Sequence, residues 1–345
     1  MPELWFWLLS LVLATYAVLD GYDFGVGLLH FAIGKTAAER DTLLRSIGPV
    51  WDGNEVWLLA SGGTVFAAFP ALYATAFSGF YLPLTIVLWL LLFRALGIEL
   101  RHQLKSPLWH QAWDVAFSAS SAILALFLGA ALGNLVRGLP LDERGEFFEP
   151  LWTDFRVGEH TGILDWYTTL VGLTATASLA LHGALWSNLK LEGELRARAR
   201  RYAIGLWVLV ATLTVMTTAA SAAVQPQLQL NLTRYPVGVL LPLLALIGLA
   251  CARLFVAKRP SWAFAGSCAF VAGMVLSAAY AIFPHALPAR VAGRDLALAD
   301  AASRSQTLEG MLYWWLPGVL LAAAYSFVIH ARMPKTFSVD DPQEH

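Results

Sequence analysis

The chain alternates between long apolar runs and short polar stretches, and the length of the apolar runs predicts helices that cross a membrane. A bilayer core of about 30 Å needs about 20 apolar residues in one helix, and by that measure the sequence predicts about nine spans. Only two polar connections are long, at 137–161 and 285–309. The predicted spans are 4–29, 55–77, 80–101, 112–136, 162–187, 203–224, 236–256, 262–284 and 310–332.

This pattern predicts an all-α integral membrane protein without a separate soluble domain. Of the 345 residues, 58% are hydrophobic and 14% are charged, whereas soluble domains carry about 25% charged residues. We therefore expect one polytopic membrane domain over 1–345, with a first bundle at 1–136 and a second half at 162–332. The formal net charge of -1 and the scattered basic residues exclude a nucleic-acid-binding surface.

Lys and Arg are unevenly distributed between the two sets of polar connections. The connections after the first, third, fifth and seventh spans, with the C-terminal tail, hold about twice as many as the N-terminus and the other connections. The run KLEGELRARARR, Lys190 to Arg201, contributes most to this difference. Because positively charged loops stay in the cytoplasm, we expect the N-terminus outside and the C-terminus in the cytoplasm.

The first span carries two aspartates in its interior, in the sequence VLDGYDFGVG. Asp20 and Asp23 are three residues apart, so on a helix they share a face. A charged Asp at the bilayer centre costs about 2.5 to 3.5 kcal/mol, so both should face protein or water. Two interpretations stay open: a buried hydrogen-bonded pair that fixes packing, or protonatable carboxyls reached from the cytoplasm. Gly21 and Gly25 should let a neighbouring helix approach closely.

A second polar stretch, PVWDGNEVW, lies at the predicted cytoplasmic start of the second span. Asp52 can cap that helix, and Glu55 three residues later completes the spacing of a capping box. In a functional interpretation, Asp52, Asn54 and Glu55 gather carboxylates and an amide at the membrane depth that Asp23 should reach. Both interpretations can hold together.

A third stretch, FRALGIELR, ends the third span on the predicted cytoplasmic side. Arg94 lies inside the apolar run, and Glu99 and Arg101 follow it. An intramembrane arginine usually finds a carboxylate, so Arg94 is expected to pair with one of the three aspartates above. The alternative is that its long side chain extends to the membrane interface.

The histidines bear on a different question, because a helical bundle can hold haem. Only His182 lies well inside a predicted span, and no second histidine stands at a matching depth, as a bis-histidine haem requires. The sequence also lacks the zinc-protease, nucleophile-elbow, P-loop and dinucleotide motifs. We therefore expect no cofactor or metal bound by this chain itself.

These stretches together resemble subunit II of the cytochrome bd quinol oxidases. The resemblance lies in LDGYDFGVG, WDGNEVW, FRALGIELR and the segment FAAFPALYATAFSGFYLPL, which includes the turn after the second span. It continues in LALHGALW, FPHALPA and TLEGMLYWWLPGVLLAAAY, so it covers essentially the whole chain.

The resemblance implies a complex of the bacterial cytoplasmic (inner) membrane that oxidises quinol and reduces oxygen to water. Subunit II of that family folds as two four-helix bundles plus a peripheral helix and forms a pseudo-symmetric heterodimer with subunit I. Two haems b, one haem d and the quinol site belong to subunit I, which meets both quinol and oxygen. The resemblance leaves room for a structural quinone or a membrane lipid in this chain, and for small single-helix subunits.

The resemblance also implies roles for the acidic residues, because the family draws the protons for oxygen reduction from the cytoplasm. Asp20, Asp23 and Asp52 are similar to residues that line this proton pathway, Asp52 being the expected outermost group, and Glu99 lies where a further member would. The residues expected to support them by shaping the turn or balancing charge are Trp51, Gly53, Asn54, Glu55, Arg94 and Arg101. The alternative function is a standalone proton- or ion-coupled transporter, which paired intramembrane carboxylates also suit.

Overall fold

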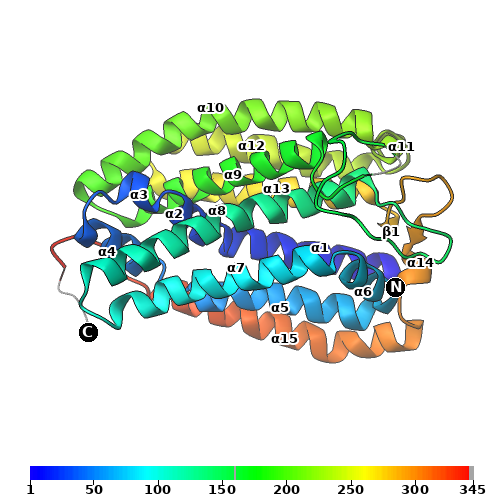
Figure 1. The fold of residues 1–345 in the computed structure, drawn as a ribbon, viewed down its shortest axis with the longest axis horizontal. Helices are drawn as coiled ribbons and strands as arrows, with labels where there is room; N and C mark the ends of the chain where they lie inside the picture. The colour runs from blue at the N-terminus through cyan, green and yellow to red at the C-terminus, as the bar shows by residue number, and fades with distance from the viewer. Residues whose placement is uncertain (159–160, 342–345) are drawn as a thin grey trace.

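Helices make up most of the computed structural model, which describes residues 1–158 and 161–341. Figure 1 shows the long helices running along one common direction, with the N-terminus at one end of the molecule and the C-terminal end of α15 at the other. The helices are α1 (Pro2–Leu19), α2 (Gly21–Leu28), α3 (His30–Ile33), α4 (Ala37–Arg45), α5 (Trp51–Ala68), α6 (Pro70–Gly79), α7 (Tyr81–Glu99), η1 (Leu100–His102), α8 (Pro107–Arg137), α9 (Trp166–Lys190), α10 (Gly193–Val224), α11 (Pro226–Arg234), η2 (Pro236–Val239), α12 (Leu240–Phe255), α13 (Pro260–Ile282), α14 (Leu298–Ala301) and α15 (Ser305–Arg332).

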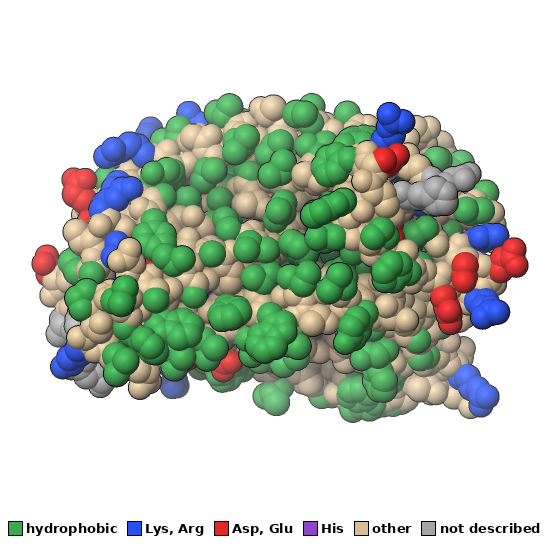
Figure 2. All heavy atoms as spheres, viewed as in Figure 1, with side chains coloured by type: hydrophobic (Ala, Val, Ile, Leu, Met, Phe, Trp, Pro, Cys, Tyr) green, Lys and Arg blue, Asp and Glu red, His purple; other side chains and the backbone are tan. Residues whose placement is uncertain are grey.

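The predicted all-α membrane fold is confirmed. Within the described residues, 8 helical segments are long and apolar enough to cross a bilayer, or 9 if the bent pair α5 and α6 forms one span. Figure 2 shows hydrophobic side chains over the middle of the visible face and most charged side chains near the two ends, as a bilayer requires. Short strands β1 (His285–Leu287) and β2 (Leu296–Ala297) pair antiparallel outside the spans.

The second span, predicted at 55–77, is not one continuous helix. Helix α5 ends at Ala68, and α6 begins at Pro70 with a bend of 119° between them. Phe69 lies at the break with φ -133° and ψ 66°. A proline disfavours the helical conformation in the residue before it and lacks the N–H needed to continue the helix, so the break falls at Phe69.

The fifth predicted span begins later than expected. Helix α9 starts at Trp166, not at 162, because Asp165 caps it: the carboxylate accepts hydrogen bonds from the backbone N–H groups of Tyr167 and Thr168. Asp165 also pairs with Arg137, which donates to Glu149 Oε1 at 2.5 Å. This buried polar cluster fixes the connection between α8 and α9 at the end of the molecule opposite α4.

Helices α2 and α9 cross in near backbone contact. A Cβ atom built on Gly25 would lie 2.0 Å from the carbonyl oxygen of Leu179 and 2.6 Å from Cα of Gly183, so neither glycine can carry a side chain without separating the helices. The predicted close approach at Gly25 is therefore confirmed. Around this crossing α1 packs against α5 and α13, and α2 against α8 and α9. The division at 1–136 and 162–332 stays a prediction.

Candidate functional site

The helical span Pro2–Leu28 places two carboxyl groups inside the bundle. Helix α1 ends at Leu19, and Asp20 links it to α2, which starts at Gly21. Asp20 and Asp23 are both 0% exposed. Neither carboxyl group faces lipid, in agreement with the cost of an uncompensated charge in a bilayer.

Arg94 on α7 joins Asp20 to a second acidic residue, Glu55 on α5. Its Nη1 lies 2.7 Å from Asp20 Oδ1, and its Nη2 donates to Glu55 Oε1 at 2.6 Å. The guanidinium lies over the ring of Phe24, 4.3 Å from the centroid. Since Arg94 is 0% exposed, it makes the expected pair with an aspartate, and its extension to the membrane interface is excluded. With both carboxyls ionised the three groups carry one excess negative charge, which one bound proton would neutralise.

Asp23 has a different environment, because its partner is an amide. Asn54 Nδ2 donates to Asp23 Oδ2 at 2.8 Å and to Tyr22 Oη at 2.7 Å. Within residues 1–158 and 161–341, Asp23 Oδ1 has no hydrogen-bond partner. Asn54 is expected from the sequence to shape a turn. Its side-chain amide nitrogen instead donates hydrogen bonds to both the carboxyl of Asp23 and the phenol of Tyr22.

The polar contacts continue from Tyr22 to α15. Tyr22 Oη and His330 Nε2 are 2.8 Å apart, and His330 Nδ1 lies 2.7 Å from the carbonyl oxygen of Ser326. A carbonyl only accepts, so Nδ1 carries the ring hydrogen, and Nε2 of the neutral imidazole accepts from Tyr22. Sequence reasoning missed both residues. The position of Tyr22 between two buried aspartates was the available signal, whereas His330 at a helix end offered none.

Asp52 lies at the surface of α5 and does not cap it. The N-cap is Val50, no side chain caps the helix, and Asp52 is in the first turn. The capping-box interpretation is therefore wrong, and Glu55 turns to Arg94 instead. Asp52 is exposed, Trp51 is buried, and Gly53 is half-buried. Glu55 lies three residues after Asp52, on the same side of the helix.

Glu99 and Arg101 lie apart from these groups. Glu99 is the last residue of α7 and is exposed. Arg101 belongs to a second buried cluster, in which its Nε donates to Asp114 Oδ1 at 2.7 Å and its Nη1 donates to Asp41 Oδ1 at 3.0 Å. His30 Nε2 also donates to Asp114, at 2.9 Å, and burial lowers the pKa of His30. This cluster ties α3 and α4 to α8.

His182 is buried in the interior with both ring nitrogens occupied. Its Nε2 donates to the carbonyl oxygen of Val18 at 2.9 Å, and its Nδ1 lies 2.7 Å from the hydroxyl of Ser267. An axial haem ligand needs one free nitrogen, so His182 does not fit that role in this arrangement. The described residues also contain no group of three or more His, Cys, Asp or Glu that could hold a metal ion.

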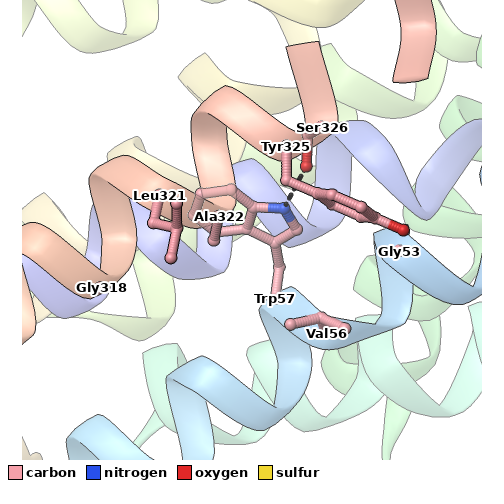
Figure 3. A pocket seen from close by; sticks show the side chains of 8 residues that line it. All are labelled: Gly53, Val56, Trp57, Gly318, Leu321, Ala322, Tyr325 and Ser326. Atoms are coloured by element: carbon pink, nitrogen blue, oxygen red, sulfur yellow. Dashed lines mark hydrogen bonds between the residues drawn. The ribbon is translucent and has the colours of Figure 1, made fainter. Parts of the chain in front are cut away.

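A groove of about 420 Å³ runs between α5 and α15. Figure 3 shows Trp57 reaching across it from α5 to Ser326 on α15, where the indole N–H and the hydroxyl oxygen are 3.4 Å apart. A smaller cavity of about 10 Å³ shares Gly53, Tyr325 and Ser326 with the groove and extends to Asn54 and His330. The residues around the groove are Gly53, Val56, Trp57, Gly318, Leu321, Ala322, Tyr325 and Ser326.

Comparisons with known proteins agree over almost the whole chain. Residues 1–333 match the family model described as cytochrome bd terminal oxidase subunit II. The chain is 32% identical over 357 residues to the probable cytochrome oxidase subunit 2 of Haemophilus influenzae, covering 96% of this chain and 93% of that protein. It is 32% identical over 352 residues to the cytochrome bd-I ubiquinol oxidase subunit 2 of Escherichia coli, covering 92% of this chain and 89% of that protein. It is also 32% identical over 338 residues to the cytochrome bd ubiquinol oxidase subunit 2 of Bacillus subtilis, covering 96% of this chain and 96% of that protein.

A solved structure has a similar fold. The chain matches a chain of the bd oxidase from Geobacillus thermodenitrificans with a TM-score of 0.74, covering 95% of this chain and 97% of that chain. The identity in this match is 16%, so the likeness concerns the fold alone.

Proposed function

The chain belongs to the cytochrome bd terminal oxidase subunit II family, and from that premise we propose that it gives protons access from the cytoplasm and supports a haem-bearing subunit I, without binding haem itself. It is a subunit of a respiratory terminal oxidase, an oxidoreductase complex of the bacterial cytoplasmic membrane. The family match favours this function over a standalone transporter.

The pairing of Asp20 and Glu55 with one guanidinium is the observation that carries the proposal. Two carboxyls around Arg94 can hold one proton between them without leaving a net charge in the membrane. Asp52 is exposed three residues before Glu55, so a proton taken up at Asp52 passes to Glu55 and then to Asp20. Asp23, about one helical turn nearer the cytoplasmic end than Asp20, belongs to the same pathway.

Glu99 and the orientation of the chain belong to the same proposal. Glu99 is exposed at the end of α7 and would collect protons at the surface. The N-terminus lies outside and the C-terminus in the cytoplasm. The segments assigned to the cytoplasm lie together at one end of the bundle, where Arg198 pairs with Glu39 and the backbone N–H of Phe337 donates to the carbonyl oxygen of Lys190. The excess of Lys and Arg in these segments is what favours a cytoplasmic location for that end.

The family and the interior of this chain both support the assignment of the haems to a partner subunit. Subunit I would hold two haems b, one haem d and the quinol site, which together supply the electron transfer to oxygen. Both ring nitrogens of His182 are occupied, so this residue offers no axial ligand to a haem, which supports the assignment. Exposed apolar side chains on α7, among them Trp89 at 58% and Leu88 at 57%, would be covered by subunit I or lipid.

The groove between α5 and α15 is the place we propose for an apolar ligand. Its walls are mainly apolar side chains of Val56, Trp57 and Leu321, which suit the tail of a structural quinone or a membrane lipid. Small single-helix subunits would bind elsewhere on the lipid-facing surface.

Charge compensation separates a proton-carrying role from a purely structural one. We would replace Asp20 by Asn alone and together with Arg94→Gln, and measure quinol-driven oxygen consumption per haem in the purified complex. Asp20→Asn should lower turnover by about tenfold or more because a proton carrier is lost. In Asp20→Asn the guanidinium keeps its pair with Glu55, and the double variant removes the guanidinium as well. Neither variant restores the lost proton carrier, so turnover should stay low in both. Wild-type turnover in the double variant would show that Asp20 only balances Arg94.

A further inference from the structure

We infer that His330, acting through Tyr22, is a second point at which protons reach Asp23, on the side of the bundle covered by α15. This inference rests on the proposed function, because it adds a branch to the same proton pathway. The branch is separate from the route through Asp52, Glu55 and Arg94, since it approaches Asp23 from α15 and not from α7.

The hydrogen bonds of the branch have defined directions. Ser326 accepts from His330 Nδ1, so Nε2 presents its lone pair to the Tyr22 hydroxyl at 2.8 Å. Asn54 donates one hydrogen to Tyr22 Oη and one to Asp23 Oδ2. The phenol oxygen and the carboxyl oxygen therefore lie next to the same nitrogen, and the branch requires one water that bridges them.

Burial decreases from Asp23 outward, as a proton route requires. Asp23 is 0% exposed and Tyr22 and Asn54 are 1% exposed, whereas His330 is half-buried. The cavity of about 10 Å³ beside Asn54 and His330 is about the size that holds one water molecule. His330 itself lies in the last turn of α15, at the end of the molecule that is predicted to face the cytoplasm.

Proton transfer along the branch balances with a single proton. His330, protonated from the cytoplasm, gives its Nε2 hydrogen to Tyr22 Oη, and the original phenol hydrogen leaves for Asp23 through the bridging water. One N–H bond of His330 breaks, one O–H bond forms on Asp23, and Tyr22 ends with the single proton it had at the start. Asn54 only donates hydrogen bonds here, so it positions the two oxygens and carries no proton.

The groups around His330 come from three other helices. Helix α2 contributes Tyr22, with the carboxyl of Asp23 beyond it, and α5 contributes the uncharged Asn54. Helix α9 contributes Lys190, whose charge acts on His330 and whose Nζ donates to the carbonyl oxygen of Pro334 at 2.9 Å. Trp186, also on α9, stacks on Tyr22 with centroids 4.0 Å apart and holds the phenol in place.

The test uses the purified haem-containing complex with variants His330→Gln and Tyr22→Phe, each alone and with Asp52→Asn. Turnover is quinol-driven oxygen consumption per haem, measured across pH. Because the Asp52 route is expected to carry most of the protons, each single variant should lower turnover by only about a tenth, whereas the same change in the Asp52→Asn background should remove most of the remaining turnover and its dependence on histidine titration. Because the two routes run in parallel, His330→Gln combined with Asp52→Asn should lose more than the product of the single effects.

Trp315→Phe is the matched control. It removes another hydrogen bond that attaches α15, from Trp315 Nε1 to Thr64 Oγ1 at 2.8 Å, and removes no titrating group. We expect wild-type turnover per haem in this variant. An equal loss in Trp315→Phe would mean that loosening of α15 explains the effect, and the inference would be overturned.

The remaining outcomes separate this branch from the proposed function. If His330→Gln and Tyr22→Phe leave the residual turnover of Asp52→Asn unchanged across pH, the branch is overturned and the Asp52 route stays intact. Loss in His330→Gln and Tyr22→Phe with Asp52→Asn silent would support the branch and overturn the Asp52 route.

Discussion

Asp20 and Arg94 form a buried ion pair, with Oδ1 of the carboxyl 2.7 Å from Nη1 of the guanidinium. The pair joins the junction of α1 and α2 to the C-terminal part of α7. Both side chains are 0% exposed, and Glu55 is the second partner of Arg94, so loss of Asp20 would leave Arg94 paired with Glu55 alone, whereas loss of Arg94 would leave both carboxyls without a cation. The pair that the sequence predicts between Arg94 and an aspartate is therefore part of a charge-coupled group of three.

Replacing Asp52 by Asn should slow the oxidase without affecting its assembly. The change keeps the shape of the side chain but removes its titrating proton, so we expect turnover of the complex to fall by at least about tenfold, or about 1.4 kcal/mol on the limiting barrier. Haem content should hold because Asp52 is exposed and caps nothing. Oxygen consumption per haem measures the effect.

The matched control for Asp52 is Asp154→Asn, an exposed aspartate in the connection on the other side of the membrane. This control should retain wild-type turnover. If Asp52→Asn is as fast as Asp154→Asn at every pH, Asp52 is not on the pathway.

Gly25→Ala should destabilise the protein by about 2 kcal/mol or more, since overpacking forces backbone shifts. The added Cβ would meet the carbonyl oxygen of Leu179 at 2.0 Å. Gly205→Ala is the control, because a Cβ at Gly205 meets nothing within 4 Å. Thermal unfolding of the complex in detergent should show a lower midpoint only for Gly25→Ala, and equal midpoints would contradict the importance of the α2–α9 contact.

Cysteine labelling tests the orientation. In a background without Cys251 and Cys268, a cysteine at exposed Arg200 should be protected from an impermeant reagent added to intact cells. A cysteine at Asp154 should react, because the proposed orientation places this position outside. The reverse labelling pattern would invert the topology.

The stability of the buried cluster of Arg137, Glu149 and Asp165 should depend on pH through Glu149. Burial raises the pKa of this carboxyl despite hydrogen bonds from Arg137 and Thr161. The native state therefore binds the proton more tightly than the unfolded chain, in which a glutamate has a pKa of about 4.3. The stabilisation is complete below that pH and is lost as pH rises through the raised native value.

Glu149→Gln should remove the pH-dependent part of the stability that protonation of Glu149 contributes. Between about pH 4 and about pH 7, the unfolding midpoint of the wild-type complex should fall relative to that of Glu149→Gln. A constant difference between the two midpoints over this range would show that Glu149 does not titrate differently in the two states.

Expression without subunit I should give a protein that lacks a haem spectrum and tends to aggregate. The exposed apolar side chains of α7 and α15 would lack part of their normal cover, which lowers the stability of the isolated chain. Absorption spectra and size-exclusion chromatography measure both effects. Stoichiometric haem in the isolated chain would refute the assignment of all haems to the partner.

Sequence by itself determined the membrane fold and the presence of polar groups inside it. Hydropathy is a local property, because about 20 consecutive apolar residues satisfy a bilayer whatever the neighbouring helices are. The cost of a bare charge in lipid likewise required Asp20, Asp23 and Arg94 to face protein or water, wherever their partners lay.

Tertiary structure decided which groups meet, because partner choice depends on the rotation and spacing of helices that are distant in sequence. The contact of Gly25 with Gly183 fixes how α2 lies on α9. Arg94 consequently pairs with Asp20 and Glu55, while Asn54 binds Asp23. The cap expected at Asp52 failed since the helix starts at Trp51, and the Tyr22–His330 contact joins helices at opposite ends of the chain, which no local pattern encodes.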